Sequence, residues 1–330
     1  MSEKIKLAEA YKNYFSIGAA INPELLSFGG ELIRTEFNSV TCENEMKFSS
    51  VHPHPGKYTF ERADIVCNFA VANNMKIRGH TLVWHNQTGS WLFKDDKGEN
   101  VNKEILYSRM KEHINTVVKR YAGKVYCWDV VNEAISDSDG EYLRIKSPYY
   151  QISDSEEYIE KAFVYAHETD PAALLFYNDY NTEVPAKREK IYRLLKSLID
   201  KGVPVHGIGL QAHYNINSDV NELRKSIDLF SSLGLTVQIT ELDISVYKPE
   251  ERGMSFSGPP ADRIALQTEL YDKIFALLRE KKDKISGVTF WGLTDNTSWL
   301  NSFPEKRNDY PLLFDANQNP KEAYFKIVRS

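Results

Sequence analysis

Short apolar, β-branched or aromatic runs alternate along the chain with longer segments that have the 3.6-residue period of helices. The runs predict strands at residues 14–21, 37–43, 76–84, 126–132, 173–177, 206–212, 236–240 and 287–291. The segments between and after them predict helices at 23–34, 61–73, 103–121, 155–168, 186–200, 219–233, 261–281 and 320–328. Because parallel strands need a long crossover, this alternation predicts successive parallel βαβ units.

Eight such units favour an α/β fold with a single closed (β/α)8 TIM barrel that spans residues 1–330. An open doubly wound sheet is the main alternative. That fold usually has a glycine-rich phosphate turn after its first strand, whereas here the first strand ends in Gly18-Ala19-Ala20-Ile21-Asn22-Pro23. No linker rich in Gly, Ser or Pro divides the chain, so we expect one domain. The longest irregular pieces, 247–260 and 300–311, follow strand ends, where barrel enzymes place function.

The composition is that of a packed soluble protein, with 42% hydrophobic and 26% charged residues among 330. The 46 acidic residues outnumber the 41 basic ones, and the net charge of −5 argues against a nucleic-acid partner. No apolar stretch approaches the roughly 18 to 20 residues of a membrane helix, so no membrane partner is expected either. The sequence leaves the oligomeric state open, a homodimer included.

The cysteines and the start of the chain favour a cytoplasmic location. Cys42, Cys67 and Cys127 are scattered and odd in number, which indicates small buried side chains rather than a disulfide framework. Residues 1–6 lead into a polar segment and not into the apolar core of a signal peptide.

Two glutamates stand out by their position. Glu133 follows the fourth predicted strand and Glu241 the seventh, so both should emerge at the carboxyl face of the barrel and face each other across it. Two opposed carboxyl groups are what glycosidic cleavage needs, one as acid and the other as base or nucleophile. Taken alone, either residue could instead be a strand-end acid paired with a nearby Arg or Lys.

The neighbours of these glutamates strengthen the catalytic interpretation. His213 ends strand six and can hydrogen-bond Glu241, while Asp243 can hold the imidazole, which would keep Glu241 ionised and oriented. Gln211 is a neutral donor for Glu133, and Asn132 offers an amide to a sugar hydroxyl.

Mixed polar and aromatic clusters at other strand ends predict a sugar-binding cleft. They lie at residues 41–47, 78–87, 176–181 and 290–299, where indole faces can stack on sugar rings and amides can bind hydroxyls. A metal site is not expected, because the eight histidines form no H-E-x-x-H motif and there is no C-x-x-C. No G-x-S-x-G follows a strand, which disfavours a serine hydrolase.

At these residues the chain closely resembles the family 10 glycoside hydrolases, retaining endo-β-1,4-xylanases of barrel fold. The likeness covers nearly the whole length and rests on seven ordered motifs: Thr41-x-Glu43-Asn44-x-Met46-Lys47, Gly79-His80-Thr81-Leu82-x-Trp84-His85, Trp128-Asp129-Val130-Val131-Asn132-Glu133-Ala134, Tyr177-Asn178-Asp179-Tyr180, Gln211-x-His213, Ile239-Thr240-Glu241-Leu242-Asp243, and Trp291-Gly292 with Trp299. Each motif is weak alone, but all seven in order form a specific signal.

The resemblance implies catalytic roles for five residues: Glu133 as acid/base, Glu241 as nucleophile, His213 and Asp243 as the pair that positions the nucleophile, and Asn132 as the ligand of the 2-hydroxyl. It also implies substrate contacts: Lys47, His80 and Trp84 around the reacting sugar, Glu43, Asn44 and Gln87 in the neighbouring glycone subsite, Trp291 and Trp299 as aromatic roof and wall, Asn178 and Tyr180 toward the aglycone, and Gln211 beside Glu133. The family carries a cis peptide after the histidine that matches His80. Phe48 stands where many relatives have Trp.

The implied reaction is the hydrolysis of internal β-1,4-xylosidic bonds in xylan or xylo-oligosaccharides by double displacement, without a cofactor. We expect the carboxylate of Glu241 to raise the pKa of Glu133. With no carbohydrate-binding module and no signal, the chain resembles the intracellular branch. The alternatives are a retaining β-1,4-glucanase or exo-acting glycosidase, and a catalytically silent sugar-binding barrel, which should lack the acid or the nucleophile.

Overall fold

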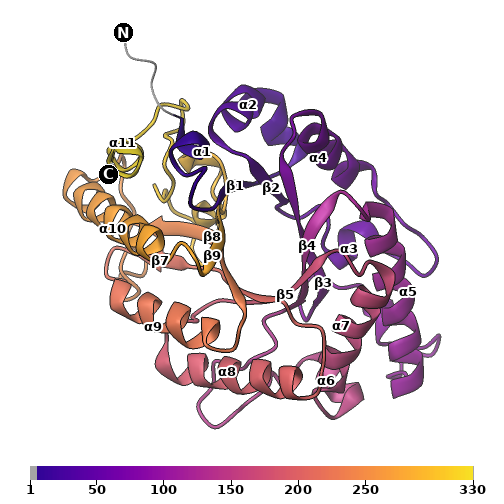
Figure 1. The fold of residues 1–330 in the computed structure, drawn as a ribbon. Coiled ribbons are helices and arrows are strands. Elements are labelled where there is room, and N and C mark those ends of the chain that lie inside the picture. The colour runs from indigo at the N-terminus through magenta and orange to yellow at the C-terminus, as the bar shows by residue number, and fades with distance from the viewer. Residues whose placement is uncertain (1–5, 330) are drawn as a thin grey trace.

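The computed structural model describes residues 6–329, and within this range eight parallel strands close into a barrel surrounded by helices (Figure 1). The barrel strands are β1 (Ser16–Ile21), β2 (Ser39–Cys42), β3 (Lys76–Trp84), β4 (Val125–Asn132), β5 (Leu174–Asp179), β6 (Gly207–Leu210), β8 (Thr236–Ser245) and β9 (Ile285–Phe290). Each pairs with its neighbour in chain order, and the pairings of β6 with β8 and of β9 with β1 complete the circle. The short β7 (His213–Asn215) follows β6 and pairs with the end of β8. The predicted barrel is confirmed.

Helices follow the strands as the sequence pattern predicts. The long ones are α2 (Pro23–Glu36), α4 (Glu61–Ala72), α5 (Lys103–Tyr121), α7 (Glu157–Thr169), α8 (Pro185–Asp200), α9 (Val220–Ser231), α10 (Ala261–Glu280) and α11 (Glu322–Arg329). The short ones are α1 (Leu7–Ala10), α3 (Phe48–Val51), α6 (Pro148–Ser153), η1 (Ser90–Leu92), η2 (Asp295–Thr297) and η3 (Trp299–Asn301). These short helices have too few residues to show a period, so periodicity does not predict them. Among the described residues, no helix combines the length and apolar character needed to cross a bilayer.

Side-chain caps determine where several barrel helices begin. Asn22 accepts a hydrogen bond from Leu25 N at 2.8 Å at the start of α2, where Pro23 is the first helical residue. Asn102 caps α5 in the same way, and Asp219 caps α9. A cap satisfies an amide that has no partner within the helix, so these residues set the helix boundaries.

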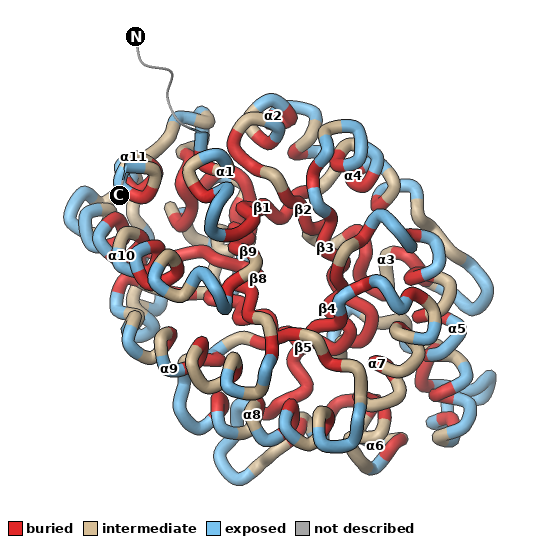
Figure 2. Tube along the Cα trace, viewed as in Figure 1, coloured by how far each residue is buried: buried red, intermediate tan, exposed pale blue. Residues whose placement is uncertain are grey.

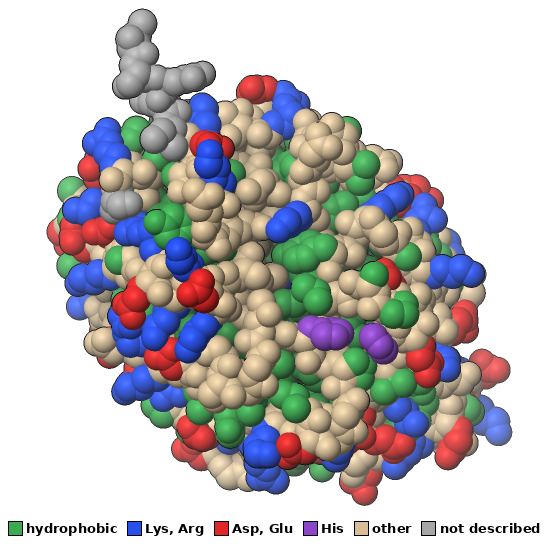
Figure 3. Space-filling view, viewed as in Figure 1, with side chains coloured by type: hydrophobic (Ala, Val, Ile, Leu, Met, Phe, Trp, Pro, Cys, Tyr) green, Lys and Arg blue, Asp and Glu red, His purple; other side chains and the backbone are tan. Residues whose placement is uncertain are grey.

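The strands are buried on both faces, between the barrel interior and the helical layer (Figure 2). The interior holds an ion pair that the sequence pattern did not predict: the guanidinium of Arg78 in β3 contacts the carboxylate of Asp129 in β4, and both are buried. Arg78 Nε also donates to Gln238 Oε1 in β8 at 3.0 Å. On the face drawn in Figure 3, acidic and basic side chains are mixed around the outer edge of the molecule.

Candidate active site

A cleft of about 1180 Å³ opens at the carboxyl ends of the strands. Most of its lining was predicted from the sequence: Glu43, Asn44, Lys47, His80, Trp84, Gln87, Asn132, Glu133, Tyr180, Gln211, His213, Glu241, Trp291 and Trp299. The β-strands of the barrel therefore bring together residues that lie up to 256 positions apart in the sequence, from Glu43 to Trp299. Asn178 and Asp243, the other two predicted residues, are fully buried behind this surface.

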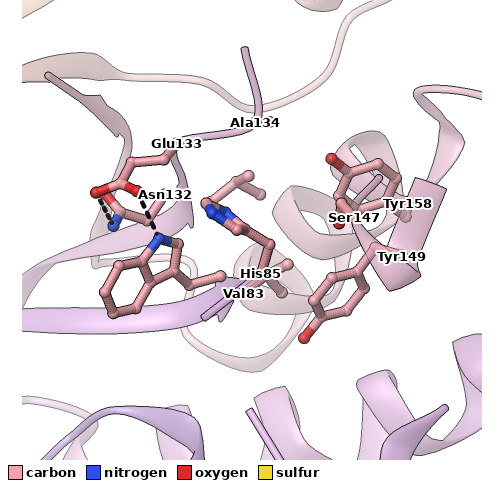
Figure 4. A pocket seen from close by; sticks show the side chains of 10 residues that line it. Val83, His85, Asn132, Glu133, Ala134, Ser147, Tyr149 and Tyr158 are labelled. Atoms are coloured by element: carbon pink, nitrogen blue, oxygen red, sulfur yellow. Dashed lines mark hydrogen bonds between the residues drawn. The ribbon is translucent and has the colours of Figure 1, made fainter. Parts of the chain in front are cut away.

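Glu133 follows β4 directly and is 9% exposed. Trp84 Nε1 donates to its Oε2 at 2.8 Å, and Gln211 Nε2 and Asn132 Nδ2 donate to its Oε1 at 3.0 and 3.2 Å. Figure 4 shows the carboxyl group of Glu133 beside Asn132, with its hydrogen bonds drawn as dashed lines. The backbone of Glu133 is left-handed, with φ of 55°. An extended residue would place consecutive side chains on opposite faces, whereas here Asn132 and Glu133 both line the cleft.

Glu241 lies in β8 and takes part in the hydrogen-bond chain expected from the sequence. His213 Nε2 is 3.2 Å from Glu241 Oε2, and His213 Nδ1 is 3.0 Å from Asp243 Oδ1. The chain continues to Trp299, whose indole N–H donates to Asp243 Oδ2 at 2.8 Å. Asn178 Nδ2 donates to the other oxygen of Glu241 at 2.8 Å. Both carboxylate oxygens are thus held by fixed donors.

Asn132 connects the surroundings of the two glutamates. Its Oδ1 accepts from Asn178 Nδ2 at 2.9 Å, the same amide nitrogen that binds Glu241. It also accepts from Gln211 Nε2 at 3.3 Å, the nitrogen that binds Glu133. The two carboxyl groups therefore share one buried amide network and face one cleft.

A glycine makes room for this network. A Cβ added to Gly209 in β6 would lie 2.1 Å from Asn178 Oδ1 and 2.7 Å from Thr240 Cγ2. Any side chain at position 209 would displace the asparagine that holds Glu241.

The two glutamates have opposite pKa shifts. Burial raises the pKa of Glu133, the charge of Asp179 raises it further, and the donors Gln211 and Trp84 oppose them. The expected cause, the Glu241 carboxylate, is the smallest of these contributions, because burial and Asp179 dominate. Burial alone would raise the pKa of Glu241 too, and it is the largest single effect. The hydrogen bond and charge of His213, the charge of His80 and the hydrogen bond from Asn178 together outweigh it, and the pKa falls to about 2.

His213 carries a positive charge at neutral pH. Burial disfavours the imidazolium, but the charge of Asp243 and the hydrogen bonds to Asp243 and Glu241 raise its pKa to about 10. The cleft therefore holds an anionic Glu241 beside a cation, and a Glu133 whose environment favours the protonated form. Such a separation of two carboxyl groups is what an acid and a nucleophile require.

Several residues predicted for the glycone side contact one another, whereas Glu43 is held by Asn22. Lys47 Nζ donates to Asn44 Oδ1 at 2.9 Å and lies 5.1 Å from the ring centroid of Trp84. Gln87 Nε2 is 3.4 Å from the same Asn44 oxygen, and Glu43 Oε2 accepts from Asn22 at 2.9 Å. These contacts place an ammonium, two amides and a carboxylate around one end of the cleft.

Aromatic rings and a cis peptide frame the centre of the cleft. Trp291 packs edge-on against His80, with ring centroids 5.3 Å apart, and Trp299 lies 4.9 Å from the imidazole of His213. The peptide bond between His80 and Thr81 is cis, as the resemblance implies.

Further cleft residues were not selected from the sequence: His85, Asn86, Arg144, Asn181, Thr297, Ser298, Ser302 and Phe303. Arg144 belongs to the segment between β4 and α6, which has no periodic pattern, so only the folded chain places it. Phe303 lies within the irregular piece 300–311 that follows the last strand. Its place after a strand end was the only sequence feature that pointed to the cleft.

Behind Glu133, a small cavity of about 10 Å³ separates it from Tyr149 and Tyr158 (Figure 4). His85 projects toward this cavity. The volume suffices for about one water molecule, so the carboxyl group is backed by packed protein. Within residues 6–329, no group of three or more His, Cys, Asp or Glu side chains is arranged to hold a metal ion.

The model of the family described as "Glycosyl hydrolase family 10" matches residues 6–330. The chain belongs to this family. It is 50% identical to a β-1,4-xylanase of Dictyoglomus thermophilum over 98% of this chain and 90% of the relative. It is 48% identical to an endo-1,4-β-xylanase of Geobacillus stearothermophilus over 98% of this chain and 97% of the relative.

Solved structures agree with this assignment to family 10. A xylanase of Paenibacillus barcinonensis, crystallised with a conduramine derivative, superposes with a TM-score of 0.96 at 46% identity and covers 99% of both chains. A mutant relative in complex with xylotriose superposes with a TM-score of 0.95 at 43% identity, over 99% of this chain and 100% of that one.

Proposed function

We propose that Glu133 and Glu241 carry out the activity of this family 10 chain, the hydrolysis with retention of internal β-1,4-xylosidic bonds in xylan or xylo-oligosaccharides. The observation that supports these roles is their shared network. Both glutamates face one cleft, yet burial keeps the pKa of Glu133 high while His213 lowers that of Glu241. One is prepared to give a proton and the other to attack.

In the first step Glu241 attacks the anomeric carbon while Glu133 protonates the glycosidic oxygen. The C–O bond to the aglycone breaks, the aglycone leaves as an alcohol, and an ester forms between the sugar and Glu241. Gln211 and Trp84, which hold both oxygens of Glu133, orient its carboxyl group for this transfer.

In the second step Glu133, now a carboxylate, takes a proton from water as the water attacks the same carbon. The ester bond breaks, and Glu241 leaves as the carboxylate that His213 and Asn178 stabilise. Two inversions give net retention, and both residues return to their starting protonation states.

Replacement of Glu241 with Gly tests the assignment. Hydrolysis of an aryl β-xylobioside should be lost, and azide should restore cleavage and give the α-glycosyl azide, because azide then fills the space of the carboxylate. In the unmodified protein, NMR should show the β anomer as the first product. Unchanged hydrolysis by the Gly variant, or an initial α product from the unmodified protein, would refute the proposal.

A screen on xylan, xylo-oligosaccharides and cellulose derivatives tests the sugar preference. We expect cleavage of the xylose polymers and little cleavage of β-1,4-glucans. A preference for glucans would support the glucanase alternative.

We also propose a cytoplasmic location. Cys42, Cys67 and Cys127 are buried and unpaired, although Cys42 and Cys67 contact each other. Buried cysteines without a disulfide are typical of proteins from a reducing compartment, and this supports the proposal. Fractionation of the producing cells tests this, and activity confined to the medium would contradict it.

A further inference from the structure

The backbone of Glu133 is held in an unusual conformation from several sides. Its φ of 55° lies in the left-handed region, which residues with a side chain adopt rarely and keep only where their surroundings impose it. Its own amide donates to Asn178 O at 2.9 Å, and its carbonyl oxygen accepts from Arg144 Nε at 2.9 Å. The conformation therefore depends on contacts with β5 and with the loop after β4.

A further buried contact comes from Tyr177 in β5. Its hydroxyl oxygen accepts hydrogen bonds from the backbone amides of Ala134 and Ile135, at 3.0 and 3.2 Å. These are the two residues that follow Glu133. The same hydroxyl donates to Asp179 Oδ2. One donor and two acceptor positions are all that a phenol offers, so its hydrogen-bonding capacity is used completely.

Asp179 is in turn fixed by a lysine. Its Oδ1 lies 2.9 Å from Lys187 Nζ, a residue of α8, and accepts from the amide of Tyr180 at 2.9 Å. Tyr177 and Asp179 are both fully buried and Lys187 is 3% exposed. Lys187 also binds Asp137 at 2.8 Å, so the ammonium is shared between two carboxylates. A buried pair with this many partners is rigid as well as neutralised.

We propose that Tyr177, Asp179 and Lys187 are positioning residues that hold the backbone of Glu133 left-handed and thereby aim its carboxyl group at the glycosidic oxygen. None of the three lines the cleft, so they act through Glu133 and not on the sugar. The proposal rests on the acid/base role of Glu133 proposed above.

A misdirected Glu133 has a distinct kinetic consequence. Protonation of the leaving group matters most when the aglycone is another sugar, because its hydroxyl is a poor leaving group. It matters least when the aglycone is an activated phenolate, which leaves without a proton. The same carboxylate must activate water in the second step, but azide attacks the glycosyl-enzyme without a base. Loss of the Tyr177 contact should therefore resemble a partial loss of the acid/base.

Tyr177→Phe tests this directly. We expect kcat/KM on xylohexaose to fall about tenfold to a hundredfold, a part of the 10²–10⁴-fold that general acid–base catalysis supplies. On a dinitrophenyl β-xylobioside, kcat/KM should change little. Azide should raise kcat on the aryl substrate and yield the β-glycosyl azide, because it attacks the ester on Glu241.

The matched control is Tyr11→Phe. Tyr11 is also buried and donates its hydroxyl proton to Ile327 O at 2.6 Å, but it packs at the ends of the chain and not at the cleft. The Tyr11→Phe variant should lose stability. The ratio of its kcat/KM on xylohexaose to that on the dinitrophenyl β-xylobioside should equal the ratio of the unmodified protein. Circular dichroism checks that each variant is folded.

Asp179→Asn provides a second, isosteric variant with a different readout. The charge of Asp179 helps to raise the pKa of Glu133, so its removal should lower that pKa and move the alkaline limb of kcat/KM to lower pH. The variant leaves Lys187 paired with Asp137 in place of two carboxylates. The charged or titratable residues of the cleft keep their identity in this variant: Glu43, Lys47, His80, His85, Glu133, Arg144, Tyr180, His213 and Glu241.

Glu133→Ala, measured alongside, separates the two proposals. If it leaves xylohexaose cleavage intact, the acid/base assignment fails. If it abolishes that cleavage while Tyr177→Phe and Asp179→Asn lower kcat/KM on both substrates equally or on neither, only the positioning proposal is overturned. Should one of the two variants fail to fold, the other decides.

Discussion

At the scale of single residues, the cleft assigns different protonation states to two chemically identical side chains. Glu133 has neutral donors and a nearby anion, whereas Glu241 has the imidazolium of His213. The difference follows from what each strand end places beside the carboxyl group, and residue type alone does not decide it.

His213 should determine the acidic limb of activity. The nucleophile must be ionised, and the pKa of Glu241 is about 2 although burial opposes ionisation. His213 contributes to this low pKa through both its hydrogen bond and its charge. His213→Ala removes that donor and charge, so the pKa of Glu241 should rise and the acidic limb of kcat/KM should move to higher pH. The measurement is a pH–rate profile on an aryl xylobioside. His54→Ala, at an exposed position outside the cleft, is the control, and an acidic limb shared by both variants would contradict the prediction.

The same residues show how far the sequence could be interpreted. His213, Asp243 and Gln211 follow predicted strands at the correct distance from the glutamates, so their contacts could be anticipated. The contribution of Asp179 to the pKa of Glu133 could not be anticipated from the sequence, because it depends on how closely two neighbouring strand ends approach.

At the scale of elements, the long helices and the strands were predictable because each repeats its pattern over several turns or pleats. Strand six is a partial exception. A single strand was predicted over 206–212, but β6 ends at Leu210, and Ala212, with φ of 60°, separates it from β7. Gln211 and His213, on either side of Ala212, both line the cleft. The sequence contains no signal for a break at this alanine.

The strands β3 and β4 are also joined by charge inside the barrel. Arg78 and Asp129 are buried together, and Asp129 Oδ2 lies 2.8 Å from His80 Nδ1. Arg78→Met would leave the carboxylate of Asp129 buried with one fewer counter-charge. We expect a loss of about 3–5 kcal/mol in the free energy of unfolding, measured with urea.

Arg34→Met is the matched control for this ion pair. Arg34 binds Glu31 on the exposed surface of α2, where a salt bridge contributes about 0–1 kcal/mol. Equal losses in the two variants would show that burial of the Arg78 pair has no special weight.

At the scale of the whole molecule, stability should depend on a buried pair of histidines. His52 and His113 face each other with their Nδ1 atoms 3.3 Å apart, outside the active site. Burial lowers the pKa of His52 to about 4; for His113, burial and then the charge of His52 lower the pKa well below its usual value.

The sign of this effect follows from linkage. The unfolded chain binds a proton at each histidine near pH 6.5, while the folded chain resists it, so stability is complete above pH 6.5 and falls toward pH 4. The shift of His52 alone corresponds to about 3 kcal/mol. Urea unfolding at a series of pH values should show this slope, and His52→Phe should reduce it. A slope that is the same in the variant would refute the assignment.

The sequence by itself determined the order of strands and helices, the barrel that they form and the family to which the chain belongs. These rest on local periodicity and on short motifs at strand ends, which are visible in one dimension. Only the tertiary structure decided three other features. They are the contact of Tyr177 with the backbone that follows Glu133, the ion pair of Arg78 with Asp129, and the position of Arg144 in the cleft. Each of these depends on distances between strands that are far apart along the chain, and burial, which sets their energies, exists only once the barrel has closed.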